Sequence, residues 1–119
     1  MHTREAHAAE PVVLTCNTKP LGATSTAFIT NWTSPSSTVG ISIDIADNRT
    51  DGRYAAVRLI AIGMNGSRSY SNWLKATGGY GDYKSWKGTS SNKTGLDHIQ
   101  LEVATFKGKR MMSHCTDIA

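Results

Sequence analysis

Cys16 and Cys115 are the only cysteines in this 119-residue chain, and they stand near its opposite ends. A disulfide between them would close a loop of about 100 residues. The loss of entropy in the unfolded chain would then stabilise the fold by roughly 4.7 kcal/mol. Because small domains are stable by only about 5–15 kcal/mol in total, one such bond can decide whether the chain stays folded. We therefore predict a Cys16–Cys115 disulfide that joins the first strand to the last.

The predicted disulfide also indicates where the protein acts, because disulfides persist in oxidising compartments outside the cytosol. We expect a secreted, extracellular protein. The alternative is a pair of free, buried thiols, since cysteine also packs as a small apolar residue. A metal site is not indicated, because the chain has no CxxC pair and His114 beside Cys115 is a poor start to a four-ligand site. We expect no metal and no cofactor.

The first ten residues differ from the rest of the chain. Residues 1–10 contain no apolar core, and Ala6-His7-Ala8 has the small-x-small form of a signal-peptidase site. We interpret residues 1–10 as a flexible N-terminal arm, either the remnant of a signal peptide or a docking segment. Residues 11–119 then form one β-domain. No run of about 18 apolar residues occurs, so no membrane-spanning helix is expected.

Alternation of apolar and polar residues recurs along the chain, whereas helical spacing does not. Ile41, Ile43 and Ile45 alternate with Ser42 and Asp44, which is typical of a half-buried strand. Further strands are expected at 12–16, 27–32, 54–62, 69–74, 98–104 and 110–116. Seven or eight short strands separated by turns indicate a sandwich or a small barrel. We expect a single-domain, all-β antiparallel sandwich.

The same alternation predicts which side chains form the core. The segment 54–62 places Val57 and Leu59 on one face and Arg58 and Ile60 on the other, so it reads as a central strand that is buried on both faces. The residues expected to face the interior are Ile41, Ile43, Val57, Leu59, Ile99, Leu101 and Val103.

Aromatic residues gather between residues 70 and 86, where glycines and lysines separate them. The candidate binding residues are Tyr70, Trp73, Tyr80, Tyr83 and Trp86. Aromatic side chains on a glycine-rich loop can stack on sugars or bases, or anchor a protein partner. The alternative is that the two tryptophans pack as cross-strand partners. We expect the tryptophans to face the core, the two tyrosines beside glycines to be exposed, and residues 76–93 to form a loop.

The charge of the chain is uneven. Residues 1–50 carry three Lys and Arg against four Asp and Glu, whereas residues 51–119 carry ten against five. The resulting pI of about 9.3 allows an acidic partner such as a wall polymer, a nucleic acid or an acidic protein. No dense basic run is present, so nucleic acid is the least favoured of these partners.

Two histidines could carry chemistry. His98 and His114, with Glu102 and Lys109 nearby in sequence, could support acid–base cleavage of RNA if both histidines entered one cleft. His98 lies on the polar face of an alternating strand, so we expect both to face solvent. The G-x-S-x-G, H-E-x-x-H and P-loop motifs do not occur. We therefore assign no catalytic residue and expect no enzymatic activity.

Four segments together resemble a known group of proteins: Asp51 to Leu59 (DGRYAAVRL), Gly79 to Trp86 (GYGDYKSW), Gly95 to Val103 (GLDHIQLEV) and Cys115 to Asp117 (CTD). Their order is similar to that in small secreted β-sandwich proteins of filamentous actinobacteria, some of which resemble the adaptor subunit of umbrella-shaped antibacterial toxin particles. The resemblance covers about residues 39–117 and rests on spacing, so it transfers no functional residue. It implies a β-sandwich and an adaptor role between other proteins.

Two functional classes follow. The first is a non-enzymatic secreted protein–protein interaction module, such as an adaptor, which would bind its partner through the N-terminal arm and exposed sheet edges. The second is a carbohydrate-binding or cell-wall-binding, lectin-like module that uses the aromatic stretch. A small basic secreted ribonuclease is a distant third.

Overall fold

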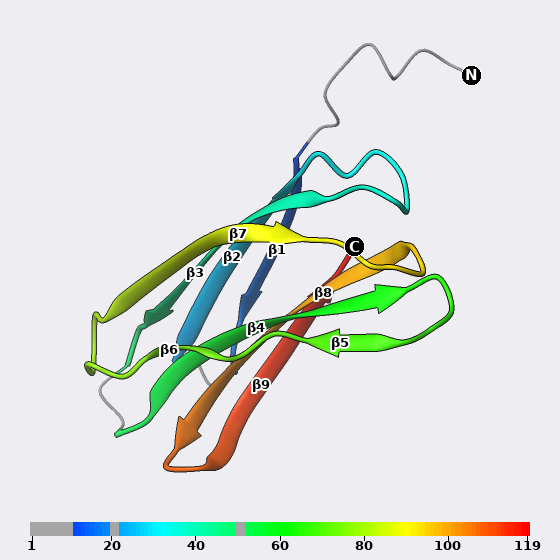
Figure 1. Cartoon of the computed structure of the whole chain (residues 1–119). Coiled ribbons are helices and arrows are strands. Elements are labelled where there is room, and N and C mark those ends of the chain that lie inside the picture. The colour runs from blue at the N-terminus through cyan, green and yellow to red at the C-terminus, as the bar shows by residue number, and fades with distance from the viewer. Residues whose placement is uncertain (1–10, 20–21, 50–51) are drawn as a thin grey trace.

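The computed structural model describes residues 11–19, 22–49 and 52–119, and in this part the chain is all β with no helix (Figure 1). No helix in the described part could therefore cross a membrane. The predicted N-terminal arm, residues 1–10, lies outside the described residues. The described strands are β1 (Val12–Asn17), β2 (Ala23–Thr30), β3 (Val39–Asp47), β4 (Tyr54–Gly63), β5 (Arg68–Tyr70), β6 (Leu74–Ala76), β7 (Tyr83–Ser90), β8 (Leu96–Lys107) and β9 (Arg110–Ile118).

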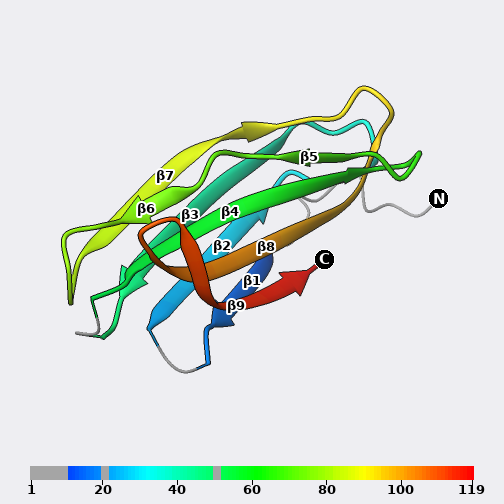
Figure 2. The same cartoon turned by 90° about the horizontal axis from the view of Figure 1, so that it is seen from below.

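The strands form two antiparallel sheets that face each other (Figures 1 and 2). The first sheet has the order β1-β2-β3-β7, and the second has the order β5-β4-β8-β9 with β6 also paired to β4. The predicted antiparallel sandwich is thereby confirmed. The expected strand 69–74 is divided into β5 and β6, which run along the same side of β4.

One prediction about the loops is wrong. Residues 76–93 were expected to form a loop, yet Tyr83–Ser90 is strand β7 and pairs with β3 from Val39 to Ala46. The sequence did not reveal this strand because most of its side chains are exposed on both faces. An edge strand with little burial does not need the apolar alternation that marks a half-buried strand.

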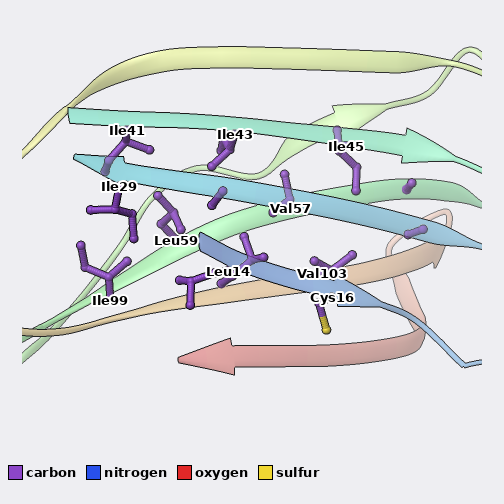
Figure 3. Packing of buried hydrophobic residues seen from close by; sticks show 14 of the residues in the cluster. Leu14, Cys16, Ile29, Ile41, Ile43, Ile45, Val57, Leu59, Ile99 and Val103 are labelled. Atoms are coloured by element: carbon purple, nitrogen blue, oxygen red, sulfur yellow. The ribbon is translucent and has the colours of Figure 1, made fainter. Parts of the chain in front are cut away.

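The core lies between the two sheets (Figure 3). All seven residues predicted to face the interior are buried. Ile29, Ile45 and Leu96 are among the largest side chains that are completely enclosed. Burying an aliphatic side chain of this size contributes about 1.5–3 kcal/mol. The alternating strands β2, β3, β4 and β8 therefore supply most of the apolar packing that holds the sheets together.

Strand β4 is buried on both faces, as its sequence predicted. Its inward residues Val57 and Leu59 join the core, while Ala56 lies in a smaller apolar cluster on the outer face of the same sheet. Phe106 belongs to that cluster, and the ring of Tyr54 stacks on it with centroids 5.3 Å apart. The sheet therefore carries an aromatic layer on the side that faces away from the core.

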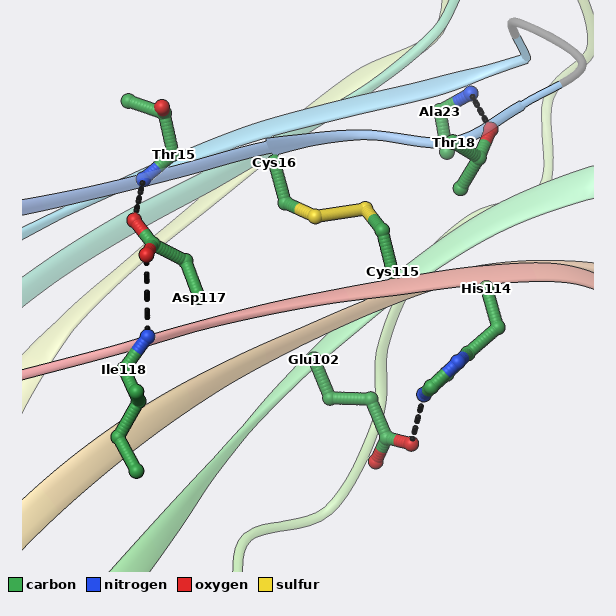
Figure 4. The surroundings of a disulfide bond; sticks show 9 residues. All are labelled: Thr15, Cys16, Thr18, Ala23, Glu102, His114, Cys115, Asp117 and Ile118. Carbon is green, nitrogen blue, oxygen red and sulfur yellow. Dashed lines mark hydrogen bonds and ion pairs between the residues drawn. A yellow bond between two sulfur atoms is a disulfide. The ribbon is translucent and has the colours of Figure 1, made fainter.

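One edge of the sandwich is closed by covalent and polar contacts (Figure 4). The predicted Cys16–Cys115 disulfide is confirmed, and it joins β1 of one sheet to β9 of the other with Cα atoms 6.2 Å apart. Beside the disulfide, the Thr15 backbone N–H donates to Asp117 Oδ2 at 3.0 Å. The outer edge of β1 is thus linked to the opposite sheet.

Candidate binding groove

The opposite edge of the sandwich is open. Here β7 of one sheet and the β5–β6 segment of the other border a groove of about 440 Å³. Core residues form its floor, namely Ile41, Ile43, Leu59, Ala61 and Ile99. The polar residues Ser69, Ser71, Asn72, Ser90 and Ser91 lie along its sides. The two sheets therefore come together at the disulfide edge and leave an apolar opening at the other.

The exposure of the core residues shows that the groove reaches down to the core. Ile29, Ile45 and Val57 are 0% exposed, whereas Ile41 and Ile43 are each 6% exposed and Leu59 is 7% exposed. Of these six residues, the three that are slightly exposed line the groove. A side chain that enters the groove would therefore contact the interior of the sandwich and exclude water from it.

Trp86 forms the wall of the groove on the β7 side. It pairs with Ile43 and so shares the inward face of the sheet, but its side chain remains 46% exposed. Its indole lies across Gly88, two residues along the same face, where a Cβ atom would overlap with the ring. The prediction that Trp86 packs in the core is therefore wrong. The groove, and not a packed layer of side chains, lies in front of the inward face of β7.

Tyr70 and Trp73 form the rim on the other side. The guanidinium of Arg58 lies 4.7 Å from the ring centroid of Tyr70 and 4.4 Å from that of Trp73. Trp73 also meets Phe106 edge to face at 5.2 Å. It is half-buried against the smaller cluster on the outer face, not in the main core where we expected it. These contacts hold both aromatic side chains in place.

Arg58 is itself fixed by a buried carboxylate. Its Nε donates to Glu102 Oε1 at 2.5 Å, and the other oxygen of Glu102 lies 2.8 Å from His114 Nε2 (Figure 4 shows the second contact). Glu102 is only 8% exposed. A buried carboxylate is tolerated when charged or polar partners satisfy both oxygens. The sequence alternation places Arg58 and Glu102 on one face, but their direct pairing follows from the β4–β8 register.

Polar groups make the β5–β6 wall irregular. The Ser71 side chain accepts a hydrogen bond from the Leu59 N–H at 2.9 Å and donates to the Asn72 carbonyl at 3.1 Å. The hydroxyl thus substitutes for a backbone group where β5 ends and before β6 begins. The interruption leaves the exposed residues Ser71 and Asn72 beside the groove.

The two remaining candidate residues lie elsewhere. Tyr80 and Tyr83 are 66% and 57% exposed, which confirms the expectation that both face solvent. Tyr80 borders a separate hollow with Arg49, Arg53 and Thr77. Tyr83 is on β7 opposite Ala46, on the face that points away from the core. Of the five predicted binding residues, the structure brings Tyr70, Trp73 and Trp86 to one groove.

The histidines do not share a cleft. His114 is opposite Ala104 on β8, six positions from His98, which corresponds to about 20 Å along a strand. His98 Nδ1 lies 3.0 Å from the Ala119 carbonyl oxygen, while His114 contacts Glu102. Among the described residues, no group of three or more His, Cys, Asp or Glu side chains could hold a metal ion.

Comparison with protein-family models, with curated proteins and with solved structures finds no match to this chain.

Proposed function

We propose that the protein is a non-enzymatic, secreted protein–protein interaction module that binds an extended peptide segment by strand addition to β7. Among the described strands, only β3 pairs with β7. A strand added to a sheet edge gains main-chain hydrogen bonds, and pockets beside that edge select alternate side chains. The observation that carries the proposal is the groove beside the inward face of β7, with Trp86 as its wall and core residues as its floor.

The contrast between the two edges supports this choice. Exposed edges invite pairing with other chains, and folded proteins usually cover them. The β1 edge is tied to β9 by the disulfide and by Asp117. The β7 edge has the groove instead of such contacts, and its strand is exposed along most of its length. The β1 edge is thus linked to the opposite sheet, whereas the β7 edge borders an open groove.

The composition of the groove suits a protein partner. Its floor is aliphatic, and Tyr70, Trp73 and Trp86 border it. Aromatic side chains that are already held in place lose little conformational entropy on binding, which favours affinity. Trp86 is held over Gly88, and Arg58 holds the other two. An extended segment could therefore place apolar side chains beside Trp86 and over the aliphatic floor, with Tyr70 and Trp73 at the opposite rim.

Secretion and an adaptor role belong to the same proposal. The disulfide supports an oxidising compartment. A small module, one edge of which can accept a strand from another protein, suits the adaptor role that the sequence resemblance implies. Its partner would be another protein of a secreted complex.

Carbohydrate binding is the second candidate. The exposed indole of Trp86 and the phenol ring of Tyr70 offer faces on which a sugar ring could stack. Hydroxyl and amide groups of Ser71, Asn72 and Ser90 line the same groove. This combination of aromatic and polar groups is also found in sites for small polar ligands. The ligand would then be a glycan or a cell-wall polymer.

A display experiment separates the two candidates. A library of random peptides long enough to span β7 is panned against the wild-type protein, Trp86→Ala and Tyr83→Ala, and the same proteins are applied to a glycan array. Tyr83 is the matched control because it is an exposed aromatic residue on the outer face of the same strand. We expect peptides that bind the wild type and Tyr83→Ala but not Trp86→Ala.

Three outcomes would contradict the proposal. Enrichment of the same peptides on Trp86→Ala would place the contact outside the groove. Loss of binding in Tyr83→Ala alone would move it to the outer face. Binding to the array with no enriched peptide would favour the carbohydrate function. Circular dichroism of each variant verifies that the fold is intact.

A further inference from the structure

We infer that the segment bound at β7 is acidic and alternates apolar with Asp or Glu side chains. The inference rests on the proposed strand addition and specifies its partner. Residues 68–93, which contain both walls of the groove, carry the five basic residues Arg68, Lys75, Lys84, Lys87 and Lys93 against one acidic residue, Asp82. Their net charge of +4 equals that of the whole chain. The open edge is therefore the basic side of the protein.

The two lysines on β7 point to different faces. Lys84 is opposite Ile45 and lies on the inward face with Trp86, whereas Lys87 is opposite Ser42 on the outer face. The Nζ of Lys84 is 3.8 Å from Asp82 Oδ1, and its side chain is 51% exposed. An exposed pair at this distance contributes little, so it leaves Lys84 able to contact another carboxylate.

Because side chains alternate between the two faces of a strand, this arrangement predicts a residue pattern in the partner. In a strand paired with β7, side chains on the inward face would enter the groove beside Trp86, and those on the outer face would lie near Lys87. Opposite charges across paired strands stabilise the pairing. A segment with apolar residues at the inward positions and carboxylates at the outer positions, ending in a carboxylate near Lys84, fits both faces.

The same lysines disfavour a second copy of the chain as the occupant. Two β7 edges that paired with each other would bring Lys84 and Lys87 of both copies to one junction. Like charges across paired strands are destabilising, and lysines on an edge are a common device against self-association. An acidic partner turns this repulsion into attraction. The charge therefore selects a different protein over self-association.

Nucleic acid is the competing acidic partner, and the floor of the groove argues against it. Ile41, Ile43 and Leu59 offer no donor for a phosphate group, and they lie where a peptide would place its apolar side chains. The basic residues of 68–93 are separated from one another in the sequence and do not form a continuous run. The arrangement matches a chain with apolar and acidic positions better than a uniformly charged backbone.

The test uses two fluorescent peptides with the same apolar residues from the peptides selected by display. The intervening outer positions, and the terminal inward position near Lys84, are Glu in one and Gln in the other. Affinity is measured by anisotropy for the wild type, for Lys84→Gln/Lys87→Gln, and for Lys107→Gln/Lys109→Gln. The last variant removes the same charge from the exposed β8–β9 turn. Measurements at low salt and at about 1 M salt, where the screening length falls to about 3 Å, isolate the electrostatic part.

We expect the Glu peptide to bind about fivefold more tightly than the Gln peptide at low salt, the size of effect that two favourable cross-strand pairs supply. The preference should fall to near unity at high salt and in Lys84→Gln/Lys87→Gln, but persist in Lys107→Gln/Lys109→Gln. Equal affinities for the two peptides would overturn the acidic partner and leave strand addition intact. If neither peptide binds, the proposed function fails with it. Displacement of the Glu peptide by a single-stranded oligonucleotide at equal charge would overturn the choice of a protein partner.

Discussion

The indole of Trp86 lies across Gly88, and a Cβ atom at position 88 would overlap with the ring. Both residues are on the inward face of β7, opposite Ile43 and Ile41. The missing side chain of one residue thus sets the position of the other. This relationship fixes the wall of the groove at the open edge of the sandwich.

Gly88→Ala should therefore displace the indole and weaken peptide binding by at least about tenfold, the effect expected when an aromatic anchor is lost. The backbone of Gly88 is outside the left-handed region, so the added methyl group should not strain it. Stability should change by less than about 1 kcal/mol. Intrinsic tryptophan fluorescence and peptide anisotropy measure both effects. Thr89→Ala, on the outer face of β7, is the control, and unchanged binding by Gly88→Ala would contradict the role of the indole.

Arg58→Ala should destabilise the fold by about 2–3 kcal/mol, because it removes a charged partner from the buried Glu102 and two cation–π contacts. Urea denaturation measures the loss. Arg58→Ala/Glu102→Gln should recover part of it, since the uncompensated carboxylate is gone. Equal stabilities of wild type and Arg58→Ala would show that the Arg58–Glu102 contact contributes nothing.

The disulfide should contribute several kcal/mol, up to about 4.7 kcal/mol for a loop of this length. Cys16→Ser/Cys115→Ser should unfold at a lower urea concentration than the wild type. Alkylation of the unfolded protein without reductant, followed by intact-mass measurement, should label neither cysteine. Two labelled cysteines in that experiment would show that the bridge is absent.

The floor of the groove should differ from the closed core in its response to mutation. Leu101→Ala removes a completely buried side chain and should cost about 2–5 kcal/mol. Ile43→Ala should cost less, because the space it leaves joins a groove that is already open, but it should weaken peptide binding. Denaturation and anisotropy of the two variants separate these effects. The opposite order of stabilities would indicate that the groove is closed in solution.

The sequence was sufficient to predict the elements whose alternation reflects burial. Ile41 to Ile45 and Val57 to Leu59 predicted the central strands, and the lone cysteine pair predicted the bridge. Strand β7 was missed because an exposed edge strand has no apolar alternation to detect. The physical basis of the successful predictions is burial, so the partly exposed edge was the least predictable region.

The groove could be predicted only in part. The aromatic stretch indicated Tyr70, Trp73 and Trp86. The separation of Tyr83 from them depends on which face of β7 points inward, and Tyr80 lies in the turn between β6 and β7. The role of Arg58 was hidden because its stacking requires the break between β5 and β6. The groove itself arises where the two sheets do not pack against each other at one edge. This feature cannot be inferred from any single segment of the sequence.

The most direct test of the open edge is backbone amide exchange, measured residue by residue with and without a display-selected peptide. Strand addition predicts slower exchange at alternate amides of β7, Tyr83–Ser90, and shifted resonances at Ser71 and Asn72, with Val12–Asn17 of β1 unchanged. Protection at β1, or bound peptide without any new protection in β7, would contradict the proposal that β7 is the edge that accepts a partner.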